Sequence, residues 1–457
     1  MRKTEPGAST SSPNDSPRIL PPYLHRVAPF IVLLGVCLYA SSGLVLAAQT
    51  LTVSPGHVLA DQPATIRVAG LQPHEHISIQ AHLFDGKAQP WASQAEFAAD
   101  DTGTVDTSTQ APVDGSYRAV SAMGLIWSMK PAAKGVQSYS TPSGVEIVHF
   151  ELMRNGTQIS TADLERTFYP AGLQEINLTG ELHGLLVLPE GFGPHPGVLV
   201  VGGSEGGTPR RPAIWLASHG YAALALAYFG VPGLPQQLVN IPLEYFGQAI
   251  GWMKQRPEIA ANQLAVMGGS RGGELALQLG ALYPALHAVV AYVPANVRFP
   301  SCCSHATASA WTWQGRPLSY DVASPSADNP ADSATIHVEL TNGPILMISG
   351  GDDGVWRSRE MADAAMQRLQ LAHFRYPFQH LSYPHAGHHA GEPLIIPTWS
   401  GGLSRLVSSA SVDPGGTPEG NALSTLDADP KVLAFLQESL ATRPAGGTDQ
   451  GPAVAPH

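Results

Sequence analysis

The stretch that most constrains the fold reads LAVMGGSRGGELALQL and covers residues 264–279. It begins with a short apolar run, turns at two glycines and a serine, and continues with apolar residues at helical spacing, the pattern of a strand, a tight turn and a helix. Gly268, Ser270 and Gly272 match G-x-S-x-G, in which small residues let the backbone bend sharply and expose the serine hydroxyl above a sheet. The sequence therefore predicts that Ser270 is a nucleophile.

A second match to the same motif makes the choice of serine depend on context. Gly202, Ser204 and Gly206 lie in VLVVGGSEGGTPRR, also after an apolar run. The prolines at positions 209 and 212 disfavour a helix directly after this turn. This run also comes earlier in the chain, where a fold with this motif usually keeps its oxyanion loop. We interpret Ser204 as part of a glycine-rich anion-binding loop.

Two backbone N–H groups are predicted to stabilise an oxyanion beside Ser270. The N–H of Arg271 lies at the start of the predicted helix, where the helix dipole is positive. The second N–H is expected from residues 203–205, with Ser204 as the candidate. Acyl transfer requires donors of this kind.

From residue 171 onward, apolar strands alternate with amphipathic helices. The strands read GLLVLPE, PGVLVVGG, YAALALAYF, HAVVAYVPA and PILMISGG, and the helices include PAIWLASH and LEYFGQAIGWMKQ. This alternation indicates a mostly parallel sheet buried on both faces, in the order of an α/β-hydrolase. We predict this domain over residues 171–441, with an irregular insertion at residues 298–337 and a last helix from Asp429.

The acid and the base that would activate the serine are expected on loops later in the chain. In this fold an aspartate or glutamate and then a histidine follow the nucleophile, each after a strand. Asp353 follows PILMISG and His388 follows LSYP, with Asp352 and His389 as the nearest rivals. His385 completes three close histidines, but the loop lacks a convincing carboxylate or cysteine partner, so a zinc site is not favoured. No metal or organic cofactor is expected.

Residues 49–170 have the pattern of short strands separated by turns. Ile77, Ile79, Ala81 and Leu83 alternate with polar residues along one such strand. Several short strands at this spacing predict an antiparallel β-sandwich. Because this part contains no cluster of acid, base and nucleophile, we expect it to be structural or to border the substrate entrance.

Residues 1–48 form a leader that predicts membrane targeting. Residues 28–48, APFIVLLGVCLYASSGLVLAA, carry no charge and are long enough to cross a bilayer. Small residues at the end of this run favour a cleaved signal peptide, and an uncleaved anchor is the alternative. We therefore expect an exported protein, periplasmic or extracellular, or one anchored to the membrane through residues 28–48. The Gly/Pro-rich tail at residues 442–457 is predicted to be disordered.

Composition excludes some classes of partner. A formal net charge of -11, with only 13% charged residues, argues against a nucleic acid or an anionic membrane surface as the main partner. Three cysteines cannot form a disulfide framework, and an adjacent pair bridges only with strain. We therefore interpret Cys302 and Cys303 as two small residues in a loop. The oligomeric state stays open.

The chain resembles a known family through several motifs in combination. In chain order these are LAYFG, IPLEYFGQAIGWM, GGSRGGELALQLGALYP, VPANV, GGDDGVWRS and YPHAGHH. Together they look like the acyl-CoA thioesterase and bile acid-CoA:amino acid N-acyltransferase family, over roughly residues 51–440. The resemblance implies an immunoglobulin-like sandwich before an α/β-hydrolase domain. It also implies the triad Ser270, Asp353 and His388.

The resemblance further implies hydrolysis of acyl-CoA to a carboxylic acid and CoA. Family members that transfer acyl groups to amino acids carry cysteine at the nucleophile position, so the serine favours water as acceptor. An exported protein would meet little acyl-CoA, and a carboxylesterase of the same fold acting on a non-CoA ester is therefore the alternative. A non-catalytic binding protein with a decayed hydrolase domain is a third possibility. The expected partner in both enzymatic cases is a small acyl thioester or ester.

Overall fold

The computed structural model describes residues 48–136, 138–302, 307–321, 332–398, 405–407 and 410–441. The predicted hydrophobic segment at residues 28–48, apart from its last residue, and the predicted tail at residues 442–457 lie outside these ranges. Among the helices within them, none combines the length and the apolar character that crossing a bilayer requires.

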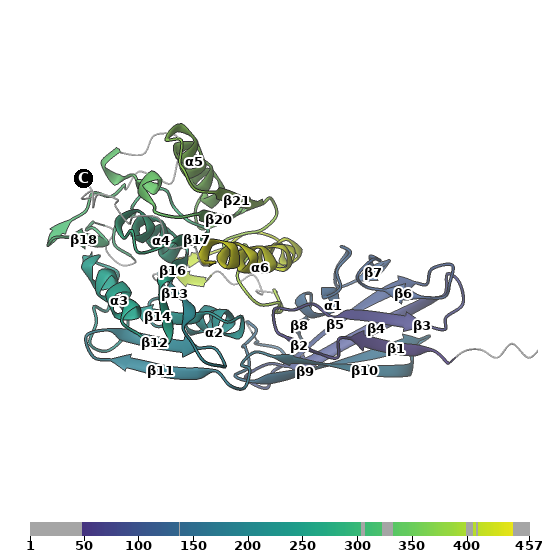
Figure 1. Ribbon diagram of the computed structural model, residues 1–457. Coiled ribbons are helices and arrows are strands. Elements are labelled where there is room, and N and C mark those ends of the chain that lie inside the picture. Colours follow the sequence, from purple (N-terminus) through teal and green to yellow (C-terminus); the bar gives the residue numbers. More distant parts are fainter. Residues whose placement is uncertain are drawn as a thin grey trace, which may run out of the picture. The chain divides into compact units, whose positions relative to one another are not determined.

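The N-terminal part is a β-sandwich, as predicted (Figure 1). One sheet has the order β1-β3-β6, and the other has the order β2-β10-β9-β4-β5-β7, with β8 paired to β5. All pairs are antiparallel except β2 with β10. The elements are β1 (Thr50–Ser54), β2 (His57–Leu59), β3 (Thr65–Ala69), β4 (His76–Phe84), β5 (Pro90–Ala98), β6 (Val105–Asp106), β7 (Asp114–Gly115), α1 (Gly124–Trp127), β8 (Lys130–Pro131), β9 (Val145–Arg154) and β10 (Thr157–Thr167).

The alternating pattern of β4 decides which of its residues enter the sandwich core. Ile77, Ile79, Ala81 and Leu83 are buried, and the residues between them are more exposed. Side chains alternate between the two faces of a strand, so one face of β4 is apolar and packs with residues of the opposing sheet such as Val68. The sequence prediction for this strand is confirmed.

An eight-stranded sheet follows, with the order β11-β12-β14-β13-β16-β17-β20-β21. The pairs β11 with β12 and β12 with β14 are antiparallel, and the others are parallel, as in an α/β-hydrolase. The strands are β11 (Gln174–Thr179), β12 (His183–Leu188), β13 (His195–Val201), β14 (Ala222–Ala227), β16 (Ile259–Gly269), β17 (Ala288–Tyr292), β20 (Ile345–Gly350) and β21 (Phe378–Tyr383).

Both faces of this sheet are covered by helices (Figure 1). Side chains of α3 (Glu244–Lys254), α4 (Arg271–Leu282) and α5 (Ser358–Leu371) share one core with the sheet. Side chains of α2 (Arg210–Ser218) and α6 (Pro418–Leu440) share the other core. The strands are apolar on both faces for this reason; every residue of β14, for example, is buried.

The predicted insertion at residues 298–337 contributes short elements beside the sheet. β18 (Trp311–Trp313) pairs with β15 (Ile241–Pro242) and with β19 (Arg316–Pro317). The insertion also contains the 3-10 turn η1 (Asp332–Ala334). The short elements outside it are the 3-10 turn η2 (Val338–Leu340) and the strands β22 (Arg405–Val407) and β23 (Ala410–Val412).

The last helix begins earlier than the sequence predicts. α6 starts at Pro418 rather than at Asp429, and it continues through Pro430. The hydroxyl of Thr417 accepts the N–H of Gly420 at 2.9 Å, and proline is well suited to the first helical position. Burial of the apolar side chains on both sides of Pro430 compensates for the backbone hydrogen bond that this proline removes.

A buried arginine connects the sandwich to the α/β part. Arg166 of β10 is fully buried, and its guanidinium donates to Glu146 at 2.9 Å, to the carbonyl of Ala60 at 2.9 Å and to the carbonyl of Ile395. The N–H of Ile395 donates in turn to Ala60 at 3.1 Å. Burial raises the pKa of Glu146, and the Arg166 guanidinium opposes this shift. Ile395 lies in the loop after β21, so the sandwich fixes part of that loop.

Replacing Arg166 with methionine should strongly destabilise the fold. The Arg166→Met variant leaves the Glu146 carboxylate buried without its cation, and breaking a buried pair in this way costs about 3–5 kcal/mol. Urea unfolding measures this loss. Adding Glu146→Gln should recover much of it, and Arg154→Met, at the more exposed pair with Glu75, should cost no more than about 1 kcal/mol. A cost below about 1 kcal/mol for Arg166→Met would contradict this account.

Candidate active site

Ser270 occupies a constrained turn between β16 and α4. Its backbone angles are φ 57° and ψ −123°, a left-handed conformation that costs energy for any residue other than glycine. A Cβ on Gly268 would come 2.2 Å from the carbonyl oxygen of Gly272, and one on Gly272 would come 2.6 Å from that of Gly202. Only glycine fits these two positions, so the turn that the motif predicts is required by backbone packing.

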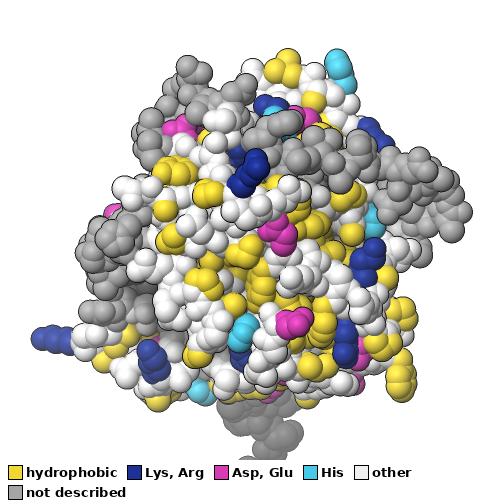
Figure 2. All heavy atoms as spheres, turned by 90° about the vertical axis from the view of Figure 1, so that its left-hand side faces the viewer, with side chains coloured by type: hydrophobic (Ala, Val, Ile, Leu, Met, Phe, Trp, Pro, Cys, Tyr) yellow, Lys and Arg dark blue, Asp and Glu magenta, His cyan; other side chains and the backbone are white. Residues whose placement is uncertain are grey.

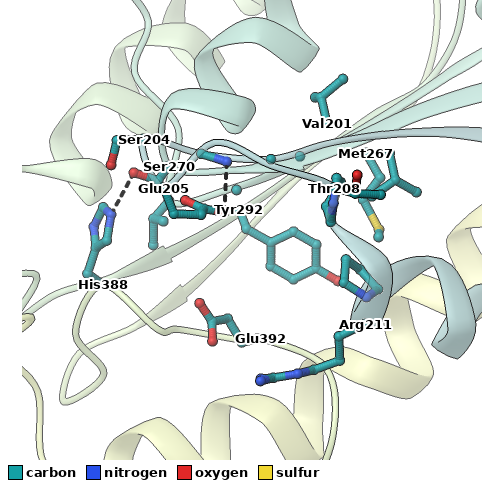
Figure 3. A pocket seen from close by; sticks show the side chains of 18 of the residues that line it. Val201, Ser204, Glu205, Thr208, Arg211, Met267, Ser270, Tyr292, His388 and Glu392 are labelled. Atoms are coloured by element: carbon teal, nitrogen blue, oxygen red, sulfur yellow. Dashed lines mark hydrogen bonds between the residues drawn. The ribbon is translucent and has the colours of Figure 1, made fainter. Parts of the chain in front are cut away.

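The structure brings Ser270, Asp353 and His388 together. Ser270 Oγ lies 2.8 Å from Nε2 of His388 (Figure 3). Nδ1 of His388 lies 2.9 and 3.0 Å from the two carboxylate oxygens of Asp353. Asp353 lies after β20 and His388 after β21, at the carboxyl ends of parallel strands. With the Nδ1 proton directed to Asp353, Nε2 is free to accept the Ser270 hydroxyl proton.

Asp353 and His388 are each held in position by other groups. Oδ1 of Asp353 accepts the N–H groups of Val355 at 2.9 Å and Trp356 at 3.2 Å, and its side chain is only 1% exposed. The ring of Trp356 packs edge-on against His388, with ring centres 5.5 Å apart. Its indole N–H donates to the carbonyl of Val293 at 3.0 Å. The carboxylate and the imidazole therefore have little freedom to turn away from each other.

A third segment, residues 413–416, joins the acid loop to the base loop. The carbonyl of Pro414 accepts the N–H of Gly354 at 3.1 Å and that of His388 at 2.8 Å. A Cβ on Gly387 would come 2.1 Å from the carbonyl oxygen of Gly415, so the backbones are in close contact. Sequence reasoning missed this segment, for which the run Pro-Gly-Gly at 414–416 is the available signal.

The rival residues take other roles. Asp352 is 54% exposed and lies 3.6 Å from His385, which is itself 80% exposed. His389 bonds through Nδ1 to Glu392 at 2.8 Å. No group of three or more histidine, cysteine or acidic side chains with the geometry to hold a metal occurs among the described residues.

The glycine-rich loop after β13 lies directly beside Ser270. A Cβ on Gly203 would come 3.3 Å from the Cβ of Ser270, which places the predicted second oxyanion donor close to the nucleophile. The N–H of Gly203 donates to Oε1 of Glu205 at 3.1 Å, so it is occupied, and the N–H of Ser204 is the better candidate. Sequence reasoning did not single out Glu205.

The side chain of Arg271 has a structural role that the sequence did not reveal. Its guanidinium donates to the carbonyls of Phe299 at 3.1 Å and Pro300 at 2.9 Å and lies 3.2 Å from the buried carboxylate of Glu274. Burial raises the pKa of Glu274, and the guanidinium opposes the shift. The backbone N–H of Arg271 is the first of α4 and has no carbonyl of its own helix to bond to, as an oxyanion donor requires.

A cavity of about 870 Å³ contains Ser270 and His388 (Figure 3). Its walls come from the glycine-rich loop, the start of α2, the loop after β14 and the loop after His388. Cys302 also lines it and is disulfide-bonded, so the interpretation of this cysteine as a simple loop residue is wrong.

Comparisons with known proteins place the chain in a family. Residues 61–180 match the family described as "Acyl-CoA thioester hydrolase/BAAT N-terminal region", and residues 241–442 match "BAAT / Acyl-CoA thioester hydrolase C terminal". The chain is 30% identical over 415 residues to human acyl-coenzyme A thioesterase 1, covering 86% of this chain and 97% of that protein. It is also 30% identical to human mitochondrial acyl-coenzyme A thioesterase 2, with 86% and 85% covered.

A solved structure, that of a putative dienelactone hydrolase from Klebsiella pneumoniae, is similar at 17% identity with a TM-score of 0.37, covering 58% of this chain and 98% of that one. The fold is that of an α/β-hydrolase preceded by a β-sandwich. The chain belongs to the acyl-CoA thioesterase/BAAT family and is a hydrolase of that family. The resemblance seen in its motifs is confirmed.

Replacing Asp429 with asparagine should make stability less dependent on pH. Asp429 of α6 is buried, and one of its oxygens accepts the N–H of Leu394 at 3.3 Å in the loop after His388. Burial raises its pKa well above the usual value, so folding favours the neutral acid. The stabilisation that neutral Asp429 contributes is fully present below about pH 3.9, the pKa of an aspartate in the unfolded chain. It is lost as the pH rises through the raised pKa of the folded state.

Asp429→Asn keeps the acceptor without the charge, so it should have a higher free energy of unfolding than the parent, with a gap that grows between pH 5 and pH 8. Asp427 serves as the contrast. Burial acts to raise its pKa, but hydrogen bonds from Lys431 and Tyr383 outweigh burial, and the net pKa is lowered. Asp427→Asn should therefore have a lower free energy of unfolding than the parent between pH 5 and pH 8. Urea unfolding at several pH values measures both variants. A gap for Asp429→Asn that stays constant with pH would contradict the assignment.

Proposed function

We propose that this protein hydrolyses acyl-CoA thioesters to a carboxylic acid and CoA, with Ser270 as nucleophile, His388 as base and Asp353 as the acid that orients the base. The observation that carries the proposal is the continuous chain of contacts Ser270 Oγ to His388 Nε2 at 2.8 Å and His388 Nδ1 to Asp353 at 2.9 Å. Family membership supports the substrate class.

In the proposed first half-reaction, the Ser270 hydroxyl loses its proton to His388 as its oxygen bonds to the thioester carbonyl carbon. The imidazolium that forms is stabilised by the nearby carboxylate of Asp353. The carbonyl oxygen becomes an oxyanion, for which the N–H groups of Ser204 and Arg271 are the proposed donors. The carbon–sulfur bond then breaks, and the CoA thiolate leaves with the proton from His388.

In the second half-reaction, water takes the place of the thiol. His388 removes a proton from water as its oxygen attacks the acyl-serine, and the proton returns to Ser270 as the acid leaves. Serine rather than cysteine at this position, together with the family resemblance, supports water as the acceptor.

A second candidate follows from the N-terminal segment. We propose export, or membrane anchoring through residues 28–48, because this uncharged run is long enough for either. An enzyme outside the cell would act on a non-CoA ester as a carboxylesterase with the same three residues. Purified protein assayed with palmitoyl-CoA and short p-nitrophenyl esters separates these substrate classes.

Fluorophosphonate labelling tests the choice of nucleophile. Ser270→Ala should abolish labelling and lower kcat by about 10⁶-fold, the scale seen when a nucleophilic serine is removed. Ser204→Ala should still be labelled, because the imidazole of His388 bonds to Ser270. Labelling that disappears in Ser204→Ala and persists in Ser270→Ala would reverse the assignment.

Replacing Glu205 tests the proposed oxyanion loop. Glu205→Ala removes the acceptor for the Gly203 N–H, so the loop beside Ser270 should lose its position, and kcat should fall by about tenfold, less than the 10²–10³-fold effect of losing an oxyanion donor itself. Glu205→Gln keeps an acceptor and should retain most of kcat, with KM nearly unchanged in both variants. Equal loss in the two variants would contradict a positioning role through this hydrogen bond.

A further inference from the structure

The cavity that contains Ser270 extends well past the reacting groups. Its lining includes residues 208–212 at the start of α2, together with Glu392 and Pro393 in the loop after His388. In Figure 3, Ser270 and His388 lie on one side of the Tyr292 ring, and Arg211 lies on the other. Val200 and Met267 also line the cavity, and the Tyr292 ring lies between Ser270 and Arg211 in Figure 3, so apolar groups form the wall between these two ends.

Most of the charged side chains that line this cavity already have a partner within the protein. Among the described residues, four charged side chains line it: Arg210, Arg211, Glu205 and Glu392. Glu205 accepts the N–H of Gly203, and Glu392 bonds to the imidazole of His389. Arg210 donates to Glu175 and lies 5.5 Å from the centre of the Tyr169 ring. Three of the four charged groups therefore already have a partner.

Arg211 is the exception. Its side chain is exposed to the cavity, and it forms no ion pair with any side chain in the described part of the chain. The face in Figure 2 shows lysine and arginine side chains scattered singly, without a basic patch that would attract an anion by itself. A guanidinium is charged at every relevant pH and binds phosphate or carboxylate groups through paired N–H donors.

We propose that Arg211 binds an anionic group of the substrate, a phosphate or a carboxylate, while the reacting carbonyl lies at Ser270. The apolar wall between the two ends accommodates an uncharged part of the same substrate. The inference rests on the proposed hydrolase function of this cavity. It adds a specificity-determining residue, and it leaves two sources for the anion: a phosphate of the CoA leaving group, or an ω-carboxylate on the acyl chain.

Two pairs of ligands distinguish the sources, using the full chain and the Arg211→Gln variant. The first pair is 4′-phosphopantetheine with CoA on the anionic side and pantetheine on the neutral side. Their dissociation constants are measured by calorimetry, and 4′-phosphopantetheine differs from pantetheine in one phosphate only. The second pair is adipoyl- and hexanoyl-N-acetylcysteamine, whose KM values are compared and which differ in one carboxylate. Arg211→Lys retains the positive charge, and Arg316→Gln removes a charge from exposed β19, outside the cavity lining.

Arg211→Gln should weaken recognition of the anionic member of one pair by about tenfold, the value of one charge-assisted hydrogen bond, and leave its neutral partner unchanged. Arg211→Lys should retain part of the effect, and Arg316→Gln should have none. The pair that responds identifies the source of the anion. If neither pair responds, or if both members of each pair weaken equally, the proposal is overturned.

The experiments distinguish a failure of the proposed acyl-CoA hydrolysis from a failure of the proposed anion subsite. If the parent hydrolyses neither palmitoyl-CoA nor adipoyl-CoA but its KM for the adipoyl N-acetylcysteamine thioester depends on Arg211, the acyl-CoA assignment is wrong and the anion subsite stands. If palmitoyl-CoA is hydrolysed and Arg211→Gln affects neither pair, the enzymatic function stands and the subsite is wrong.

Discussion

The backbone conformation of Ser270 is the constraint on which the rest of the site depends. A residue with a Cβ at φ 57° is strained, and the strain persists only where the surroundings leave no alternative. Here the surroundings are other backbones: Gly268 and Gly272 approach neighbouring carbonyls so closely that no side chain fits. The N–H of Ser270 also donates to the carbonyl of Tyr292 on the adjacent strand at 3.0 Å. The hydroxyl is thereby directed away from the sheet, toward the loops that carry Asp353 and His388.

Parallel strands then explain why residues distant in sequence meet at this hydroxyl. β16, β20 and β21 run in the same direction, so their carboxyl ends lie at one edge of the sheet. The loops that leave these ends carry the proposed nucleophile, acid and base. Residues 413–416 lie between the last two loops and bond to both. The geometry of the site is therefore shared among four segments, and none of them can move without disturbing its neighbours.

Buried charges connect this site to the remainder of the molecule. Arg271 pairs with Glu274 and bonds to the segment at residues 299–300, and Arg166 pairs with Glu146 and bonds to Ile395. In each case a guanidinium satisfies backbone carbonyls as well as its carboxylate, which compensates for the cost of burying both charges. The sandwich thus contributes to the position of the loop that follows His388, although it supplies no side chain to the proposed chemistry.

Much of this could be predicted from the residues alone. The alternation of Ile77 to Leu83 predicted a half-buried strand, the fully apolar strands predicted a sheet covered on both faces, and G-x-S-x-G predicted a tight turn with a serine. These predictions succeed because each depends on local spacing and on the steric limits of the backbone. The start of α6 was predicted eleven residues late, at Asp429 rather than Pro418, and the helix continues through Pro430 because apolar side chains on both sides of this proline are buried.

Sequence by itself determined the two-part organisation and the family, and it predicted Ser270, Asp353 and His388 with Asp352 and His389 as rivals, because motif order and strand periodicity are properties of the chain alone. Tertiary structure alone decided that His388 is the histidine that bonds to Ser270 and that Asp353 is the aspartate that bonds to His388. It also decided that Glu205 occupies the Gly203 N–H and that Arg211 remains unpaired among the described side chains of its cavity. Such choices depend on which side chains from distant segments converge after folding. Spacing along the chain can nominate such residues, but it does not fix which neighbouring side chain makes the contact.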